Sequence, residues 1–152
     1  MSRPPSLDDL AVRSLRRGTT LRLRARGGSM LPFLRDGDLL VIRPAPAGEV
    51  RIGDVICYEP APGGLCLHRV IAREKRGVVT RGDALAYVET VPDGAVLGLV
   101  TAVERRGRVR RLDTPAARRR GRLIARAAPA IARLLPLARS LRRAVRALRR
   151  RA

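Results

Sequence analysis

A single serine lies in a glycine-rich turn, where its hydroxyl would be open to a substrate. In the segment Gly27-Gly28-Ser29-Met30-Leu31-Pro32, two glycines before the serine permit tight backbone geometry and close approach of another chain. A nucleophile for acyl transfer needs room for attack and N–H donors near the developing oxyanion. The backbone amides of Gly28, Ser29 and Met30 are the candidates for those donors. The same string also forms ordinary turns, so it is weak evidence by itself.

The chain has one histidine, His68, within the apolar run Leu65-Cys66-Leu67-His68-Arg69-Val70-Ile71. Any Ser/His pair must therefore use it. A lone histidine between apolar neighbours is more often a core residue than a catalyst. The residue type alone leaves both roles open.

Three Gly-Asp pairs precede apolar runs and supply candidate acids: Gly37-Asp38, Gly53-Asp54 and Gly82-Asp83. An aspartate at a strand entrance commonly hydrogen-bonds its own turn. Spacing does not decide which of the three, if any, orients the histidine.

The elements that must position these residues are mostly short strands. Ser6 can cap a helix that ends at Gly18, with Asp8 and Asp9 in its first turn. Residues 19–26 then alternate between apolar and basic side chains, which predicts a half-buried strand. Short apolar runs bounded by turn residues follow, and they predict a compact, mainly antiparallel β domain. The turn at residues 60–64 would join two strands as a hairpin, with Cys57 roughly opposite Cys66.

The charge distribution divides the chain into an N-terminal helix (1–18), a β domain (19–113) and a basic tail (114–152). The whole chain carries a formal net charge of +20, and residues 114–152 hold 13 Arg and no acidic residue. The spacing of apolar residues and arginines in the tail predicts an amphipathic helix, which Pro129 and Pro136 should kink or break. Its aliphatic stripe could lie on an anionic membrane surface, or it could pack on the β domain or a partner.

The composition of the chain argues against several classes of protein. No uncharged stretch of about 18 residues exists, and residues 1–15 lack the apolar run of a secretory signal, so we expect a cytoplasmic chain, at most peripheral to a membrane. Two cysteines are too few for a disulfide framework or a structural zinc site, and we expect no metal or cofactor. Aromatic residues are too scarce for base stacking, and no nucleic-acid-binding motif is visible despite a pI near 11.9.

Five motifs taken together resemble the signal peptidase I family and, more broadly, the S24/S26 serine peptidase superfamily. In chain order they are Ser29-Met30-Leu31-Pro32, Gly37-Asp38, Gly53-Asp54-Val55, His68-Arg69-Val70 and Thr80-Arg81-Gly82-Asp83. The match covers roughly residues 19–104. It implies a fold of coiled, mostly antiparallel strands with Ser29 as the nucleophile.

Within this superfamily the chain resembles the branch that uses histidine as general base. Its one lysine, Lys75, lies in a charged turn, whereas His68 stands in the His-Arg-Val context of that branch. The resemblance gives Asp83 the role of orienting His68. A second acid usually follows about six residues later, where Glu89 stands, with Asp93 further on.

This chain departs from the family at two places. Gly27 replaces a serine that often helps to form the oxyanion hole. We also find no counterpart of the family's N-terminal membrane anchor.

The resemblance predicts a serine endopeptidase of the signal peptidase type that cleaves a precursor or leader peptide through an acyl-enzyme. One alternative is a catalytically inactive domain that keeps Ser29 and His68 as turn and core residues. The other is a protein that binds nucleic acid or an anionic membrane through its basic tail.

Overall fold

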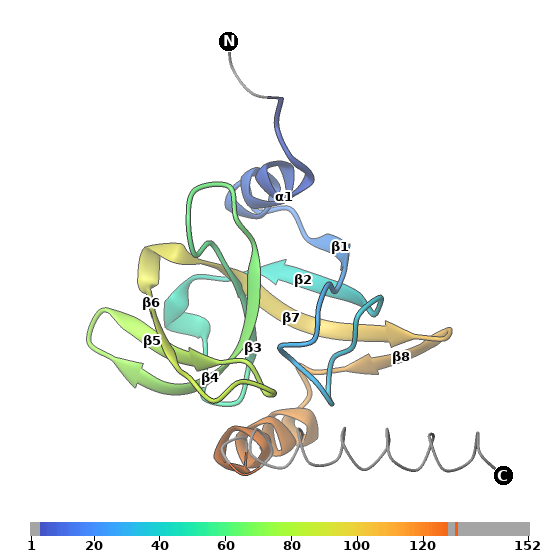
Figure 1. The fold of residues 1–152 in the computed structure, drawn as a ribbon, viewed down its shortest axis with the longest axis vertical. Helices are drawn as coiled ribbons and strands as arrows, with labels where there is room; N and C mark the ends of the chain where they lie inside the picture. The colour runs from blue at the N-terminus through green and yellow to red at the C-terminus, as the bar shows by residue number, and fades with distance from the viewer. Residues whose placement is uncertain (1–3, 128–129, 131–152) are drawn as a thin grey trace, which may run out of the picture.

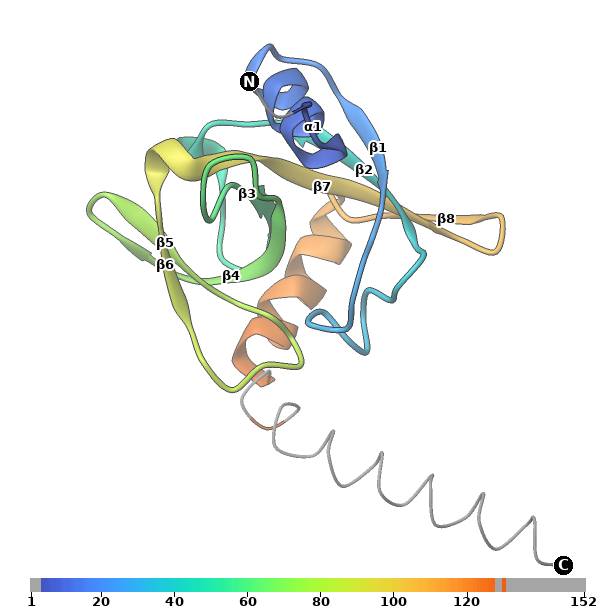
Figure 2. The ribbon, with the colours of Figure 1, turned by 45° about the horizontal axis from the view of Figure 1, so that its top comes forward.

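The computed structural model describes residues 4–127 and residue 130. Eight strands make a single antiparallel sheet in the order β1-β2-β7-β3-β4-β5-β6, and β8 pairs with β7. The sheet coils on itself, with α1 at one end and a second helix at the other (Figures 1 and 2). The elements are α1 (Leu7–Arg16), β1 (Leu21–Arg24), β2 (Leu39–Pro44), η1 (Ala47–Glu49), β3 (Val55–Tyr58), β4 (Cys66–Glu74), β5 (Gly77–Arg81), β6 (Glu89–Pro92), η2 (Asp93–Ala95), β7 (Val96–Arg105), β8 (Arg108–Arg111) and a helix over residues 115–127. The predicted mainly β fold with terminal helices is confirmed.

Helix α1 forms where its local signals predict it. Ser6 caps it, because the Asp9 amide donates to the Ser6 hydroxyl oxygen and the Asp9 carboxylate accepts from the Ser6 amide, a reciprocal capping box. Gly18, with φ of +86°, follows its C-terminus. The helix buries Ala11, Val12 and Leu15, which holds it over the sheet beside β1.

The strands also follow the alternating pattern, with one omission. β1 keeps Leu21 and Leu23 half-buried and Arg22 and Arg24 exposed, as predicted. β6 was not predicted. It has no apolar run, since only Val91 of its four residues is buried, and its strand geometry comes from pairing with β5.

The core consists of two aliphatic clusters. One joins α1 to β1, β2, β3 and β7 and includes Leu15, Leu40 and Cys57. The other lies toward β4, β5 and β6 and includes Ile56, Val70 and Val78. Together they fix β3 and β4, which carry the residues of the candidate site.

The hairpin between β3 and β4 has a register one residue away from the prediction. Tyr58 pairs with Cys66, and Cys57 pairs with Leu67. A shift of one residue moves a side chain to the other face of a sheet, so Cys57 and Cys66 point to opposite faces. Both thiols are free.

The first part of the predicted tail packs on the β domain. A β-carbon added at Gly121 would lie 2.5 Å from the carbonyl oxygen of Gly53, so the helix over 115–127 lies directly against the turn before β3. Arg81 donates to the carbonyl oxygen of Ala125, which is buried. Beyond residue 127 the predicted tail, with its two prolines, lies outside the described residues apart from residue 130. Within the described part, no helix is both long and apolar enough to cross a membrane.

Candidate functional site

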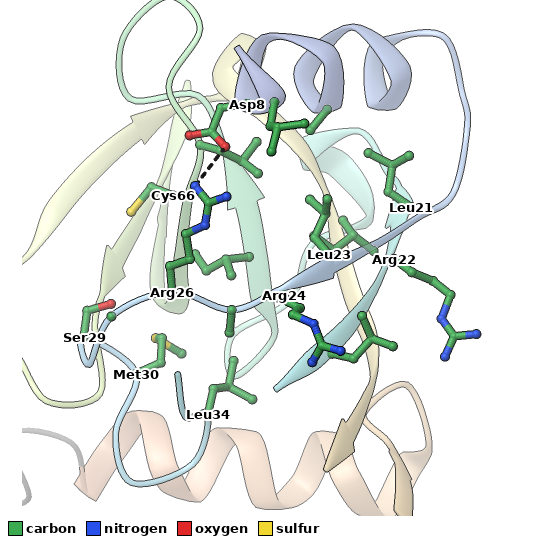
Figure 3. Close-up of a pocket in the computed structure, with 18 of the residues that line it drawn as sticks. Asp8, Leu21, Arg22, Leu23, Arg24, Arg26, Ser29, Met30, Leu34 and Cys66 are labelled. Atoms are coloured by element: carbon green, nitrogen blue, oxygen red, sulfur yellow. Dashed lines mark ion pairs between the residues drawn. The ribbon is translucent and has the colours of Figure 1, made fainter. Parts of the chain in front are cut away.

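Ser29 lies in the turn that follows β1. Gly27 has a φ of +80°, a conformation that glycine adopts without steric cost, and its amide donates to the Asp36 carboxylate. The Ser29 carbonyl oxygen accepts the amide of Ala84 at 2.8 Å. Ser29 is half-buried, and Figure 3 shows it at the end of the β1 segment. The turn is therefore held from two sides.

The backbone around Ser29 offers unoccupied amides. The carbonyl oxygens of Gly28 and Met30 accept hydrogen bonds from Leu31, Phe33 and Leu34. Among residues 4–127, however, the structure describes no acceptor for the N–H groups of Gly28, Ser29 or Met30. Free N–H groups beside a serine are the donors that an oxyanion requires.

His68 lies in β4 and is 3% exposed. Its Nδ1 atom lies 3.0 Å from the Tyr58 hydroxyl and 3.1 Å from Oε2 of Glu89. The Tyr58 hydroxyl donates to the same Glu89 oxygen at 2.5 Å. The Glu89 side chain is 41% exposed. The side chains of Tyr58 from β3 and Glu89 from β6 therefore meet at Nδ1 of His68 in β4.

These contacts fix how the imidazole carries its proton. The Tyr58 hydroxyl donates its hydrogen bond to Glu89, so the phenol oxygen and the carboxylate are both available to Nδ1 as acceptors. Nδ1 therefore carries the hydrogen, and Nε2 keeps its lone pair. Burial lowers the pKa of His68 below its ordinary value, against the opposing effect of Glu89. The ring is neutral at pH 7 and can accept a proton at Nε2.

His68 and Ser29 both line a pocket of about 540 Å³. Sγ of Cys66 lies 3.8 Å from Nε2. Within the described residues no hydrogen bond joins Ser29 Oγ to His68. Catalytic hydrogen bonds are often long without a substrate, so this geometry is compatible with a Ser29–His68 pair.

Asp83 hydrogen-bonds an arginine, whereas the family resemblance assigns it to His68. It is fully buried, and its two carboxylate oxygens accept from Nε and the NH2 nitrogen of Arg69 at 2.8 and 2.7 Å. Arg69 also donates to the carbonyl oxygen of Gly53. Within the described residues no hydrogen bond joins Asp83 to His68. Asp83 therefore anchors the turn whose next residue, Ala84, holds the Ser29 carbonyl.

The remaining candidate acids make other contacts. Asp93 lies 3.6 Å from an Arg73 guanidinium nitrogen. Asp38 forms a two-point ion pair with Arg105, whose hydrogen bonds hold the pKa of that carboxyl below its ordinary value. Asp54 accepts the amide of Arg51 three residues earlier. Asp54 thus stabilises the turn in which it lies. Asp93 and Asp38 form ion pairs with arginines and, within the described residues, do not contact the histidine.

Two residues of the site, Tyr58 and Cys66, were not found from the sequence. Cys66 and His68 are two residues apart, so they share a face of β4. Tyr58 pairs with Cys66 across the hairpin, so the correct register would have placed both residues near His68. Burial raises the pKa of the Tyr58 phenol, with Cys66 and Glu89 adding to the effect. It also raises the pKa of the Cys66 thiol. Both groups therefore stay protonated at neutral pH.

A larger groove of about 620 Å³ opens beside Ser29 (Figure 3). It runs between α1 and β1, and every residue from Leu21 to Gly27 lines it. Consecutive residues of a strand point to opposite faces, so a groove lined by all of them follows the edge of the strand. β1 stands at the end of the sheet order and pairs only with β2 among the described strands.

Within residues 4–127 no group of three or more histidine, cysteine or acidic side chains is arranged to hold a metal ion. The chain matches no protein-family model, no curated protein and no solved structure.

Proposed function

We propose that this protein is a serine endopeptidase in which Ser29 is the nucleophile and His68 the general base. The observation that carries the proposal is the arrangement of the imidazole. Nδ1 is held by Tyr58 and Glu89, which leaves Nε2 as the basic nitrogen, and His68 lines the same pocket as Ser29. Such a base, oriented by an acid on its far nitrogen, is what activation of a serine requires.

The reaction proceeds in two stages. Nε2 of His68 takes the Ser29 hydroxyl proton as Oγ bonds to the peptide carbonyl carbon. The resulting oxyanion lies toward the free amides of the turn at residues 28–30. His68 then gives its proton to the amine as the C–N bond breaks, which leaves an acyl-enzyme. Water attacks the ester, loses a proton to His68, and releases the acid as Ser29 recovers its hydrogen.

The acid in this proposal is Glu89. Its carboxylate lies 3.1 Å from Nδ1, so it stabilises the imidazolium that forms during attack. Tyr58 acts as a positioning residue, because its hydroxyl contacts both Glu89 and Nδ1. Asp83 acts through the backbone, by holding the turn that binds the Ser29 carbonyl.

The substrate lies extended along the free edge of β1. An edge strand presents unpaired amides and carbonyls that an added peptide can pair with. Ser29 lines the groove together with the residues of that edge, so a bound precursor peptide would pass its backbone by the nucleophile.

Labelling with a serine-reactive fluorophosphonate tests the assignment. We expect the full-length protein to form an adduct, located at Ser29 by mass spectrometry, and Ser29→Ala and His68→Ala to form none. Thr19→Ala, which removes an exposed hydroxyl between α1 and β1, is the matched control and should label like the wild type. Absence of labelling in well-folded wild type, with no cleavage of a library of peptides, would refute the proposal.

Cys66 is a rival nucleophile, because its sulfur lies 3.8 Å from Nε2. Its raised pKa disfavours the thiolate that a cysteine peptidase needs. If Cys66→Ala loses peptide cleavage while Ser29→Ala keeps it, the chemistry belongs to the thiol.

The nucleic-acid-binding and membrane-binding alternatives depend on the basic tail. Most of that tail lies outside the described residues, so both remain predictions. A truncation after residue 127 keeps the helix that packs on Gly53. It should therefore abolish binding to liposomes or DNA without loss of peptide cleavage.

A further inference from the structure

The groove beside Ser29 has an ordered distribution of charge. Its wall along β1 alternates between apolar residues (Leu21, Leu23, Ala25) and basic residues (Arg22, Arg24, Arg26). The three apolar side chains are buried or half-buried, and the three arginines are exposed. The groove thus has an apolar side and a cationic side, separated by the backbone of β1.

The apolar side continues onto α1. Leu7 and Leu10 line the groove and are 71% and 46% exposed. Both belong to α1, and Leu65 and Leu67 add further apolar lining. Large exposed apolar side chains around a groove favour burial of apolar groups from a ligand.

The cationic side is only partly neutralised. Arg22 pairs with Glu104 at 2.6 Å, and Arg26 lies 4.0 Å from Asp8, the one acidic residue among the described residues that line the groove. Figure 3 shows the Arg26–Asp8 pair between the β1 segment and the start of α1. Arg24 donates to a backbone carbonyl and forms no ion pair within the described residues. The rim therefore retains positive charge that a carboxylate could neutralise.

A peptide added to the edge of β1 would match this pattern residue by residue. In paired strands the side chains of opposite residues lie on the same face. The residues opposite Leu21 and Leu23 would enter the apolar side, and those opposite Arg22 and Arg24 would meet the guanidinium groups. A peptide with the same period of two satisfies both faces at once.

We propose that the groove selects, as substrate of the peptidase, an extended segment in which apolar side chains alternate with acidic ones. The inference rests on the proposed function for the cleavage step. Binding of the segment depends only on the groove.

The test uses full-length Ser29→Ala protein and fluorescent ten-residue peptides at low ionic strength. One peptide alternates leucine or valine with glutamate. A second has glutamine in place of every glutamate, and a third has the composition of the first with the acids gathered in one block. Anisotropy gives the Kd of each. A cross-strand ion pair changes affinity by about 1.4- to 5-fold, so the three arginines predict that the alternating peptide binds about tenfold more tightly than either comparison peptide.

The protein variant Arg22→Gln/Arg24→Gln/Arg26→Gln should bind the alternating peptide about tenfold more weakly than its parent. The matched control is Lys75→Gln/Arg76→Gln/Arg108→Gln, which removes the same charge from exposed turn and strand positions outside the groove. It should keep the affinity within about twofold. Because the peptide series leaves the protein unchanged, it also decides the question if the triple variant does not fold.

The outcomes separate this inference from the proposed function. Charge-dependent binding without cleavage by the wild type supports the groove assignment and counts against the peptidase. Cleavage of all three peptides at equal kcat/KM supports the peptidase and overturns the inference. Equal affinity for the alternating and the blocked peptide also overturns it, because a general attraction to acids would then explain binding.

Discussion

Replacing Glu89 by glutamine removes the negative charge beside His68 and keeps the size of the side chain. Glu89 Oε2 lies 3.1 Å from Nδ1 and also accepts the Tyr58 hydroxyl. A hydrogen bond to a charged group contributes about 1.5–3 kcal/mol. Because the Glu89 side chain is 41% exposed, solvent screening places the effect at the lower end, about 1.5–2 kcal/mol. We therefore expect kcat to fall about 10- to 30-fold in Glu89→Gln, well short of the ~10⁴-fold loss for a buried triad acid.

The same substitution shifts the pH profile in a defined direction. Catalysis requires neutral His68, so activity is lost as the pH falls through the pKa of this group. Burial places that pKa below the ordinary value of 6.5, and Glu89 is the largest influence that raises it. Without the Glu89 charge the pKa falls further, so the acid limb of kcat should move to lower pH.

The assay is hydrolysis of a cleaved peptide by wild type, Glu89→Gln and Asp93→Asn between pH 4 and 8. Asp93 begins η2 directly after β6, lies beside Arg73, and forms no hydrogen bond or ion pair with His68 within the described residues, so its variant should keep the wild-type acid limb. An unchanged acid limb in Glu89→Gln, or a shift to higher pH, would show that Glu89 is not the acid that supports the base.

Three further substitutions test other parts of the structure. Asp83→Asn leaves a buried guanidinium without its charge partner, so the free energy of unfolding should fall by about 3–5 kcal/mol in denaturant titrations; an unchanged midpoint would contradict the buried pair. Tyr58→Phe removes one hydroxyl that contacts both Glu89 and Nδ1, so kcat should fall about three- to tenfold with an unaltered circular dichroism spectrum. Gly53→Ala places a β-carbon 2.5 Å from the Arg122 backbone nitrogen at a φ of +98°, and its Tm should fall by roughly 5–10 °C. Gly48→Ala, with no atom within 4 Å, is the control, and an equal Tm for the two variants would show that the helix over 115–127 does not pack there.

Local signals were enough to predict the parts of the fold that depend on neighbours in sequence. The Ser6 cap, the first-turn aspartates and Gly18 define α1, and the alternation in β1 appears in its burial. β6 and the register of the β3–β4 hairpin were not predicted in this way. β6 depends on pairing with β5. The exact register of the β3–β4 hairpin depends on the geometry of the whole turn between the two strands.

The acid of the site could not be chosen from the sequence for a related reason. Adjacent residues of a strand point to opposite faces, so His68 and Arg69 leave β4 in opposite directions. Arg69 holds both carboxylate oxygens of Asp83. Glu89 reaches Nδ1 only because β6 lies beside β5, which in turn pairs with β4. Sheet order, and not distance along the chain, decides which carboxylate meets the histidine.

The two faces of β4 thereby connect the turn of Ser29 to the surroundings of His68. On one face His68 meets Tyr58 and Glu89. On the other, Arg69 binds Asp83, and the adjacent amide of Ala84 holds the Ser29 carbonyl. Loss of the Glu89 charge should therefore move the acid limb of the pH profile clearly. Loss of Asp83, whose charge raises the pKa of His68 less than Glu89 does, should displace Ser29 and move the acid limb only slightly. Measured below its melting temperature, Asp83→Asn should thus lower kcat at every pH, and a large shift of its acid limb would mean that Asp83 supports the imidazole after all.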